Sequence, residues 1–439
     1  MKADSSLSFC TFQTRIGTIK VLSERGLNLL NTFEQQLQNY AELAVKVGVN
    51  IQPNQNLFIS ASTDVREFVR IIVEKAYGAG ARQVFVDWSD DVIARIRYEQ
   101  APADSFTEFP SWKIAEREEL AKKGTAFMSI VSQSPDLFKN VDPSRIRDAQ
   151  KASGQALDGF RQMMQADKFS WTVIAAPSTD WASLVFPDLP ESEQVSALWN
   201  AIFKAARANT ADPVAEWELH NQRLHEKVDY LNNKHYLKLH YTAPGTDLTI
   251  ELPEKHTWCG AGSVNADGAT FMANMPTEEV FTAPLKSGVN GVVSSTKPLS
   301  YGGTIIDDFK ITFKDGKITD IAAGQGQDVL ENMIEADEGA KYLGEVALVP
   351  HESPISASGL LFYNTLFDEN ASNHLAIGSA YAFNLDGGKE MNRKELEENG
   401  LNQSITHVDF MIGSGEMDID GILADGTVEP LFRKGTWAF

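Results

Sequence analysis

Residues 56–88, NLFISASTDVREFVRIIVEKAYGAGARQVFVDW, decide the fold of the first half of this chain. The stretch opens on a short apolar strand and continues with apolar side chains at helical spacing over residues 65–77. Gly78-Ala79-Gly80 ends this helix, and a second strand follows over residues 82–88. A strand, a helix and a strand in this order are typical of a βαβ unit, whose strands lie parallel in one sheet.

The same alternation continues through the rest of the first half. Helical spacing is found over residues 33–47, from about residue 91, and over 144–164, 192–208 and 213–232; strand patterns are found over 126–131 and 171–176. Strands that alternate with helices predict a parallel sheet with helices on both faces. We therefore expect a parallel-sheet α/β domain that ends near Lys234.

Hairpin patterns replace this alternation in the second half. Alternating stretches at residues 236–241 and 247–252 flank Ala243-Pro244-Gly245, and two more flank Asp315-Gly316, a dipeptide suited to a two-residue turn. With one helix expected over residues 327–340, this pattern predicts an α+β, largely antiparallel domain. The predicted parts are an extension without clear elements over residues 1–31, the α/β domain over 32–234 and the antiparallel domain over 235–439.

The charge of the chain limits its partners. Its 439 residues include 60 Asp and Glu against 39 Lys and Arg, a formal net charge of −21. An acidic surface repels phosphate backbones, so nucleic acid is not expected as a partner. The first twenty residues lack the apolar core of a signal peptide, and no apolar run reaches 18 residues, so no membrane span is expected. Two cysteines, Cys10 and Cys259, fit a reducing compartment, and a cytoplasmic location is predicted.

Several common catalytic motifs are absent from the sequence. Four glycine pairs lack the third glycine of a dinucleotide-binding fingerprint, namely those that begin at Gly78, Gly260, Gly324 and Gly413. Residues 294–297 match S-x-x-K, but the companion elements of a serine acyl-enzyme are missing. The sequence therefore favours neither dinucleotide chemistry nor serine catalysis.

The strongest candidate for a metal site lies late in the chain. Residues 406–413, THVDFMIG, look like a strand, and the two-residue period of a strand places His407 and Asp409 on one face. An imidazole nitrogen and a carboxylate side by side form half of a site for a divalent ion. A hydrogen bond between these two side chains explains the same pattern, so the pair alone leaves both interpretations open.

Further carboxylates stand beside apolar strands or turns. Glu369 and His374 are five residues apart in a polar segment, so they converge only through a loop or a bent helix start. Glu345 interrupts an otherwise apolar strand, where an unpaired carboxylate is costly unless a cation or a proton neutralises it. Glu278 and Glu279 precede another apolar strand. A bound cation would remove the cost of burying such carboxylates.

The collected residues suit a pair of divalent ions. Two metals held by carboxylates and histidines are usually about 3.5–4 Å apart and share one bridging carboxylate. The set comprises Glu279, Glu345, Glu369, His374, His407 and Asp409. The spacing of these residues also permits ordinary hydrogen-bonded pairs, so spacing alone does not establish a metal centre.

Four long motifs follow one another in the second half. They are NMPTEEVFTAP at residues 274–284, GEVALV at 344–349, NTLFDENAS at 364–372 and THVDFMIG at 406–413. In this order they resemble the aminopeptidase T / aminopeptidase S family of metallopeptidases. The resemblance is dense from about residue 258 to residue 439 and weaker over residues 31–256, and residues 1–30 lie outside it.

The resemblance implies a dinuclear metal-dependent aminopeptidase that removes N-terminal residues from short peptides with broad specificity. The six collected residues would bind two divalent ions (zinc, cobalt, manganese or magnesium), with Glu345 as the bridging ligand, so residues 235–439 would form the metal-binding catalytic domain. Tyr381 matches a family tyrosine near the metals and is a candidate donor to the developing oxyanion or, equally, a residue that orients a metal ligand. Glu278 is a candidate general base, although adjacent strand residues point to opposite faces. A homodimer is implied as well.

Two other functions fit the same residues. Another dinuclear hydrolase, such as a phosphoesterase, uses similar ligands, but phosphate sites usually add Arg or Lys. Lys297 and Arg433 are the basic residues near the motifs. A non-catalytic peptide-binding protein with structural metals is the second alternative. Hydrolysis of an amide substrate, compared with hydrolysis of a phosphate ester, separates the three functions.

Overall fold

A computed structural model of the chain describes residues 24–439. Residues 1–23 of the predicted extension lie outside this range, and helix α1 begins at Glu24, inside the predicted extension. The first half contains a four-stranded parallel sheet with the order β2-β1-β3-β4. Its strands are β1 (Asn56–Ser62), β2 (Gln83–Ser89), β3 (Ala126–Val131) and β4 (Trp171–Ala175). The parallel sheet predicted from residues 56–88 is confirmed.

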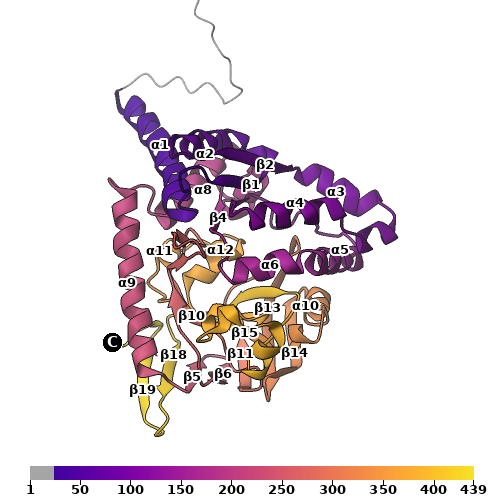
Figure 1. Cartoon of the computed structure of the whole chain (residues 1–439), viewed down its shortest axis with the longest axis vertical. Coiled ribbons are helices and arrows are strands. Elements are labelled where there is room, and N and C mark those ends of the chain that lie inside the picture. Colours follow the sequence, from indigo (N-terminus) through magenta and orange to yellow (C-terminus); the bar gives the residue numbers. More distant parts are fainter. Residues whose placement is uncertain (1–23) are drawn as a thin grey trace, which may run out of the picture.

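Helices cover both faces of this sheet (Figure 1). The helices of this half are α1 (Glu24–Leu43), α2 (Arg66–Gly78), α3 (Asp91–Gln100), α4 (Ser111–Lys122), α5 (Pro143–Ala156), α6 (Asp158–Gln165), α7 (Thr179–Val185), α8 (Glu191–Ala205) and α9 (Pro213–Lys234). Leu57 and Ile59 of β1 share an apolar core with Phe68 of α2. Phe58 lies between them, points to the opposite face and packs with Leu120 of α4. Within residues 24–439, none of the helices combines the length and apolar character of a membrane span.

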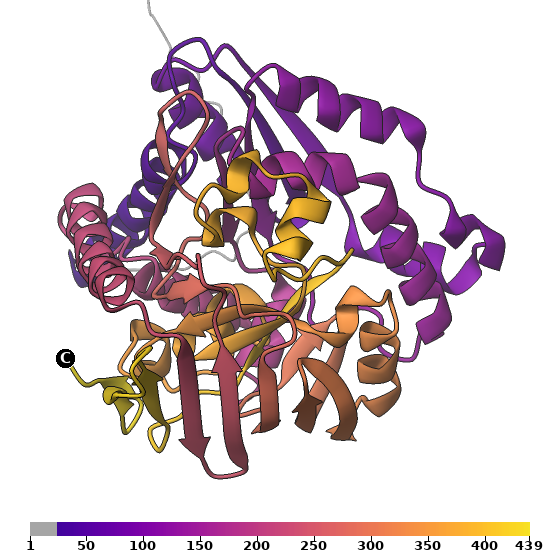
Figure 2. The ribbon, with the colours of Figure 1, turned by 60° about the horizontal axis from the view of Figure 1, so that its bottom comes forward.

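A large antiparallel sheet forms the base of the second half. Its nine strands have the order β12-β13-β11-β6-β5-β18-β19-β20, with β14 paired to β13. They are β5 (Lys238–Ala243), β6 (Thr246–Glu251), β11 (Val289–Ser294), β12 (Leu299–Tyr301), β13 (Thr304–Lys314), β14 (Lys317–Gln325), β18 (Asp418–Ile422), β19 (Val428–Arg433) and β20 (Thr436–Trp437). Both predicted hairpins are present, as β5–β6 and β13–β14. Figure 2 shows the β5–β6 hairpin at the lower edge of the molecule.

A smaller antiparallel sheet packs against the large one, and both sheets contribute to the apolar core of the second half. Its order is β17-β16-β15-β10-β7, and a separate hairpin, β8–β9, precedes β10 in the chain. These strands are β7 (Cys259–Gly260), β8 (Gly262–Val264), β9 (Thr270–Met272), β10 (Val280–Thr282), β15 (Leu343–Leu348), β16 (His374–Gly378) and β17 (His407–Met411). The helices of this half are α10 (Gln327–Ile334), α11 (Pro354–Ala357), α12 (Thr365–Asp368) and α13 (Arg393–Glu398). An α+β second half is therefore confirmed.

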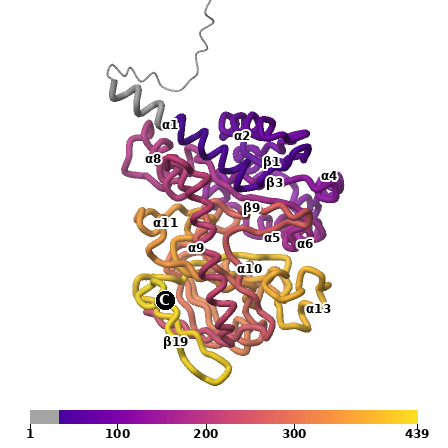
Figure 3. The backbone as a smooth tube through the Cα atoms, turned by 60° about the vertical axis from the view of Figure 1, so that its left-hand side comes forward, coloured from indigo at the N-terminus to yellow at the C-terminus, as the bar shows by residue number. Residues whose placement is uncertain are grey.

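The two halves share their apolar cores. Helix α9 runs beside both halves (Figure 1), with Trp217 in the core of the first half and Leu231 in that of the second. Met272 of β9 and Phe367 of α12 come from the second half but belong to the first core. Strand β9 accordingly lies among the elements of the first half (Figure 3). The predicted division at residue 234 coincides with the end of α9, whereas the packing extends across it.

Candidate metal centre

The smaller sheet presents a charged face. Side chains alternate along its strands, and Val346 of β15 and Phe410 of β17 point into the apolar core of the second half. Their neighbours Glu345 and Asp409 therefore point to the opposite face. The structure also brings His407 and Asp409 together on that face, as the strand period predicts. Three adjacent strands thus direct polar side chains to one side of the sheet.

Small residues on the central strand leave space between the charged side chains. Glu345 pairs with Ala376 of β16, and Ala376 pairs in turn with Asp409 of β17. Directly paired residues point to the same face, so a single methyl group lies between the two carboxylates. His407 pairs with Gly378, whose positive φ of 111° and crowded surroundings exclude a side chain. The small Ala376 side chain therefore leaves space between the carboxylates, whereas the Cβ position of Gly378 is filled by the Thr406 backbone.

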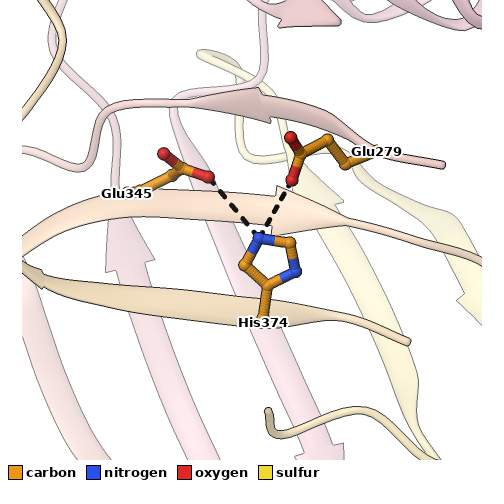
Figure 4. A group of neighbouring side chains, drawn as sticks. All are labelled: Glu279, Glu345 and His374. Carbon is orange, nitrogen blue, oxygen red and sulfur yellow. Dashed lines mark ion pairs between the residues drawn. The ribbon is translucent and has the colours of Figure 1, made fainter. Parts of the chain in front are cut away.

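Glu279, Glu345 and His374 form the first close group (Figure 4). Glu279 Oε2 lies 3.0 Å from His374 Nε2, and Glu345 Oε1 lies 3.6 Å from the same nitrogen. Glu279 immediately precedes β10, whereas the other two lie on β15 and β16. All three side chains are buried. Their ligand atoms are close enough to surround one metal ion.

Glu345, His407 and Asp409 form the second close group. His407 Nε2 lies 3.4 Å from Glu345 Oε2 and 3.5 Å from Asp409 Oδ1. Glu345 thus belongs to both groups and offers a different oxygen to each histidine. A carboxylate placed in this way is suited to bridge two metal ions.

Backbone carbonyls hold both histidine rings in the orientation that a metal ligand needs. His374 Nδ1 lies 2.9 Å from the Glu369 carbonyl oxygen, and His407 Nδ1 lies 2.7 Å from the Ser379 carbonyl oxygen. A carbonyl only accepts hydrogen bonds, so each Nδ1 carries the hydrogen and donates it. Each Nε2 is then left facing the carboxylates, which is the usual arrangement around a metal-bound histidine.

Glu369 reaches the centre from a short turn. Helix α12 is capped by Asn364, and the 3₁₀ turn η5 (Glu369–Ala371) follows it directly. The buried carboxylate of Asp368 accepts the backbone N–H groups of Phe362 and Asn364 at 3.0 Å and fixes this segment. Glu369 and His374 converge through this turn. The Glu369 carboxylate lies outside both close groups but lines the same cavity.

Burial disfavours the charges that gather at this centre. It raises the pKa of Glu279 and raises that of Glu369 strongly, and the charge of Asp409 adds to the effect on Glu369. Burial alone would lower the pKa of both histidines, but Glu279 and Glu345 outweigh it at His374, and Tyr381, Asp409 and Glu345 outweigh it at His407, so both pKa values lie well above the usual range. Asp409 Oδ1 is buried without a hydrogen-bond partner among residues 24–439. The residues present therefore fit a divalent cation, which would neutralise the carboxylates and bind this oxygen.

Tyr381 stands beside the second group. Its ring centroid lies 4.9 Å from that of His407 and 5.1 Å from that of Phe383, on which it stacks. Burial raises its pKa, so the phenol is a neutral hydrogen-bond donor at neutral pH. Tyr381 lines the cavity that contains the six candidate ligands.

Glu278 points away from this cavity. Both of its carboxylate oxygens accept hydrogen bonds from Arg207, at 2.6 and 3.0 Å, and its backbone N–H donates to Asn370 Oδ1 at 2.7 Å. His220 lies on the same side, with its Nε2–H donating to the Thr277 carbonyl. This arrangement argues against the predicted general-base role of Glu278. The side chain instead anchors the segment that holds its neighbour Glu279.

The cavity also contains residues that the sequence did not single out. It has a volume of about 400 Å³ and extends from the candidate ligands to Asp167 and Trp171 of the first half. Phe383 and Lys389, which follow β16, line it as well. Asp167 and Lys389 are 222 positions apart, so no local motif connects them. The first half therefore contributes to the site directly.

A buried cavity with carboxylates and two oriented histidines is the kind of centre that metal-dependent hydrolases use. The sequence profile of a family described as thermophilic metalloprotease (M29) matches residues 33–437. The chain therefore belongs to this metalloprotease family, and it is a hydrolase that needs a divalent metal ion. The resemblance seen in the four motifs is confirmed.

Individual relatives are similar over nearly their whole length. The chain is 62% identical over 410 residues to aminopeptidase AmpS of Bacillus subtilis, covering 93% of this chain and 100% of that protein. It is 41% identical over 408 residues to aminopeptidase T of Thermus thermophilus, with 93% and 100% covered. The solved structure of wild-type AmpT from Thermus thermophilus is similar with a TM-score of 0.85 at 40% identity, covering 93% of this chain and 100% of that one.

Proposed function

We propose that this metal-dependent aminopeptidase binds two divalent ions and that Glu345 bridges them. The orientation of the Glu345 carboxylate carries the proposal, because Oε1 faces His374 and Oε2 faces His407. The proposed ligands are Glu279, Glu345, Glu369, His374, His407 and Asp409. Relatives named as aminopeptidases, at 41% and 62% identity, support short peptides with a free N-terminus as substrates.

The residues of the cavity divide the catalytic work. Two such ions, held by these ligands, would supply an activated water at neutral pH and would polarise the scissile carbonyl. The hydroxyl of Tyr381 donates a hydrogen bond to the oxygen that gains charge, a contact worth about 3 kcal/mol in comparable oxyanion sites. Arg207 donates to both oxygens of Glu278, which argues for another group as the proton acceptor.

The experiment compares two substrates on one protein sample. Leucyl-p-nitroanilide and p-nitrophenyl phosphate are incubated with the protein as purified, after chelator treatment, and after zinc, cobalt, manganese or magnesium is restored. We expect amide hydrolysis that disappears with the chelator and returns with metal. Phosphate hydrolysis without amide hydrolysis would support a phosphoesterase. Metal binding without either activity would support a peptide-binding protein.

Helix α3 supports the proposal of a homodimer. It has no buried residue, and Val92, Ile93 and Ile96 are 69%, 67% and 46% exposed. An apolar helix face of this kind often marks a protein interface. Light scattering on the wild type should give the mass of a dimer, and Ile93→Lys should shift it towards a monomer. Val428→Lys, at another exposed apolar residue, is the control.

A cytoplasmic location stays a prediction from the sequence.

A further inference from the structure

A row of aromatic rings leads from the metal ligands to an ion pair whose carboxylate is buried and whose lysine is partly exposed. The ring of Tyr381 lies 4.9 Å from that of His407, and Phe383 stacks on Tyr381 at 5.1 Å. Lys389 Nζ stands 5.7 Å from the centroid of the Phe383 ring and 2.8 Å from Asp167 Oδ2. All of these residues line the same cavity. The cavity thus has metal ligands, an aromatic wall and an ion pair in succession.

The ion pair leaves one polar atom free. The Asp167 residue is 3% exposed, and its Oδ1 has no hydrogen-bond partner among residues 24–439. The indole N–H of Trp171, also in the cavity wall, has none either. Buried polar atoms are nearly always satisfied in the working state of a protein. Burial raises the pKa of Asp167, and hydrogen bonds with Lys389, Trp171 and Ser263 lower it, so a small adjustment between Asp167 and Trp171 satisfies both atoms within the protein.

A second cavity meets the first at the metal ligands. It has a volume of about 380 Å³ and extends to Gln133 and Ser300. The two share Glu369, Tyr381 and Asp409, together with Trp171 and Asn274. The first cavity is lined by all six candidate ligands, whereas the second is lined only by Glu369 and Asp409 among them. The first cavity is therefore the place for the side chain of the N-terminal residue.

We propose that the Asp167–Lys389 ion pair is the specificity determinant for the side chain of the substrate's N-terminal residue. An apolar side chain of the substrate's N-terminal residue lies along the rings of Tyr381 and Phe383 and ends before the Asp167–Lys389 ion pair. A basic side chain must compete with Lys389 for Asp167, and an acidic one must compete with Asp167 for Lys389. Because each charge already has a partner, the wild type favours neither sign. The inference rests on the proposed aminopeptidase function.

The test removes one charge at a time. The variants Lys389→Met and Asp167→Asn are compared with the wild type on leucyl-, arginyl- and glutamyl-p-nitroanilide. Lys389→Met frees Asp167, so the arginyl-to-leucyl ratio of kcat/KM should rise by about tenfold, as for a charge-assisted hydrogen bond. Asp167→Asn frees Lys389, so the glutamyl-to-leucyl ratio should rise by a similar factor. The double variant should return both ratios towards those of the wild type.

Controls separate specificity from stability. Lys394→Met removes a charge whose side chain is 84% exposed on α13 and should leave all three ratios unchanged. Lys389→Arg keeps the charge and should keep the wild-type ratios. Ratios are taken within each variant, so partial unfolding lowers all three rates equally and does not change them. Unchanged ratios in both single variants would overturn the inference, whereas a wild type that does not cleave leucyl-p-nitroanilide would overturn the proposed function itself.

Discussion

Glu345 illustrates how one residue connects two groups of ligands. Its strand places it opposite Ala376, and its two oxygens face different histidines. The motif GEVALV indicated an isolated carboxylate in an apolar strand, and this was a sound signal because burial without a partner is costly. Asp167 and Lys389 gave no such signal. Each lies in an ordinary polar segment, and only the packing of the two halves brings them together.

At this scale, replacement of Glu345 should affect both ions at once. We expect Glu345→Ala to lower kcat by more than about a hundredfold, because changes to residues that merely support ligands already cost about 10–100-fold. Metal analysis of the purified variant should give fewer than two ions per chain. Glu352→Ala, at an exposed position nearby, should change neither quantity. Two bound ions with normal turnover in Glu345→Ala would refute the bridging role.

The adjacent pair Glu278 and Glu279 offers a second test on single residues. Glu278→Gln breaks a buried ion pair with Arg207, so the free energy of unfolding should fall by about 3 kcal/mol, with metal content retained. Glu279→Gln should instead lower metal content. Denaturant unfolding and metal analysis of both variants check the two expectations. Loss of metal in both variants would contradict the separate roles and show that metal binding requires both carboxylates.

Individual elements differed in how well the sequence predicted them. Helix α2 was predicted closely because it buries one apolar stripe against the sheet. Helix α4 was missed because Leu120 and Ala121 are its only buried residues among the twelve, so it has no apolar period. Helix α7 is only seven residues long, too short to show a period. The predicted helix over residues 144–164 is two helices, since the chain breaks at Leu157 between α5 and α6.

Strand β16 allows a prediction about a whole element. Ala376→Val adds two methyl groups between the carboxylates of Glu345 and Asp409, so activity and metal content should both fall, activity by more than tenfold. Ile377→Val changes the opposite face of the same strand, which packs into the core. It should lower the free energy of unfolding by about 1 kcal/mol and leave the metal content unchanged. Equal metal content in the two variants would contradict this account of the strand.

For the molecule as a whole, the metal centre should contribute to stability. Ions that bind only the folded chain stabilise it by about 2.7 kcal/mol when their concentration is a hundred times Kd. Calorimetry should therefore show a lower Tm after chelator treatment and a full recovery after metal is restored. The Glu345→Ala variant should show a smaller difference between the two states. An unchanged Tm in the wild type would mean that the ions do not bind preferentially to the folded state.

The shared cores affect how chimeras of related enzymes could be built. A crossover at residue 234 would take Trp217 of α9 from one parent and Met272 and Phe367 from the other, although all three belong to the same apolar core. Shape mismatches between the parents would then fall inside a core, where packing is dense and tolerates little change. A chimera that exchanged the β8–β9 hairpin and the segment around α12 together with the first half would keep each core from one parent. The useful unit of exchange is therefore discontinuous in sequence.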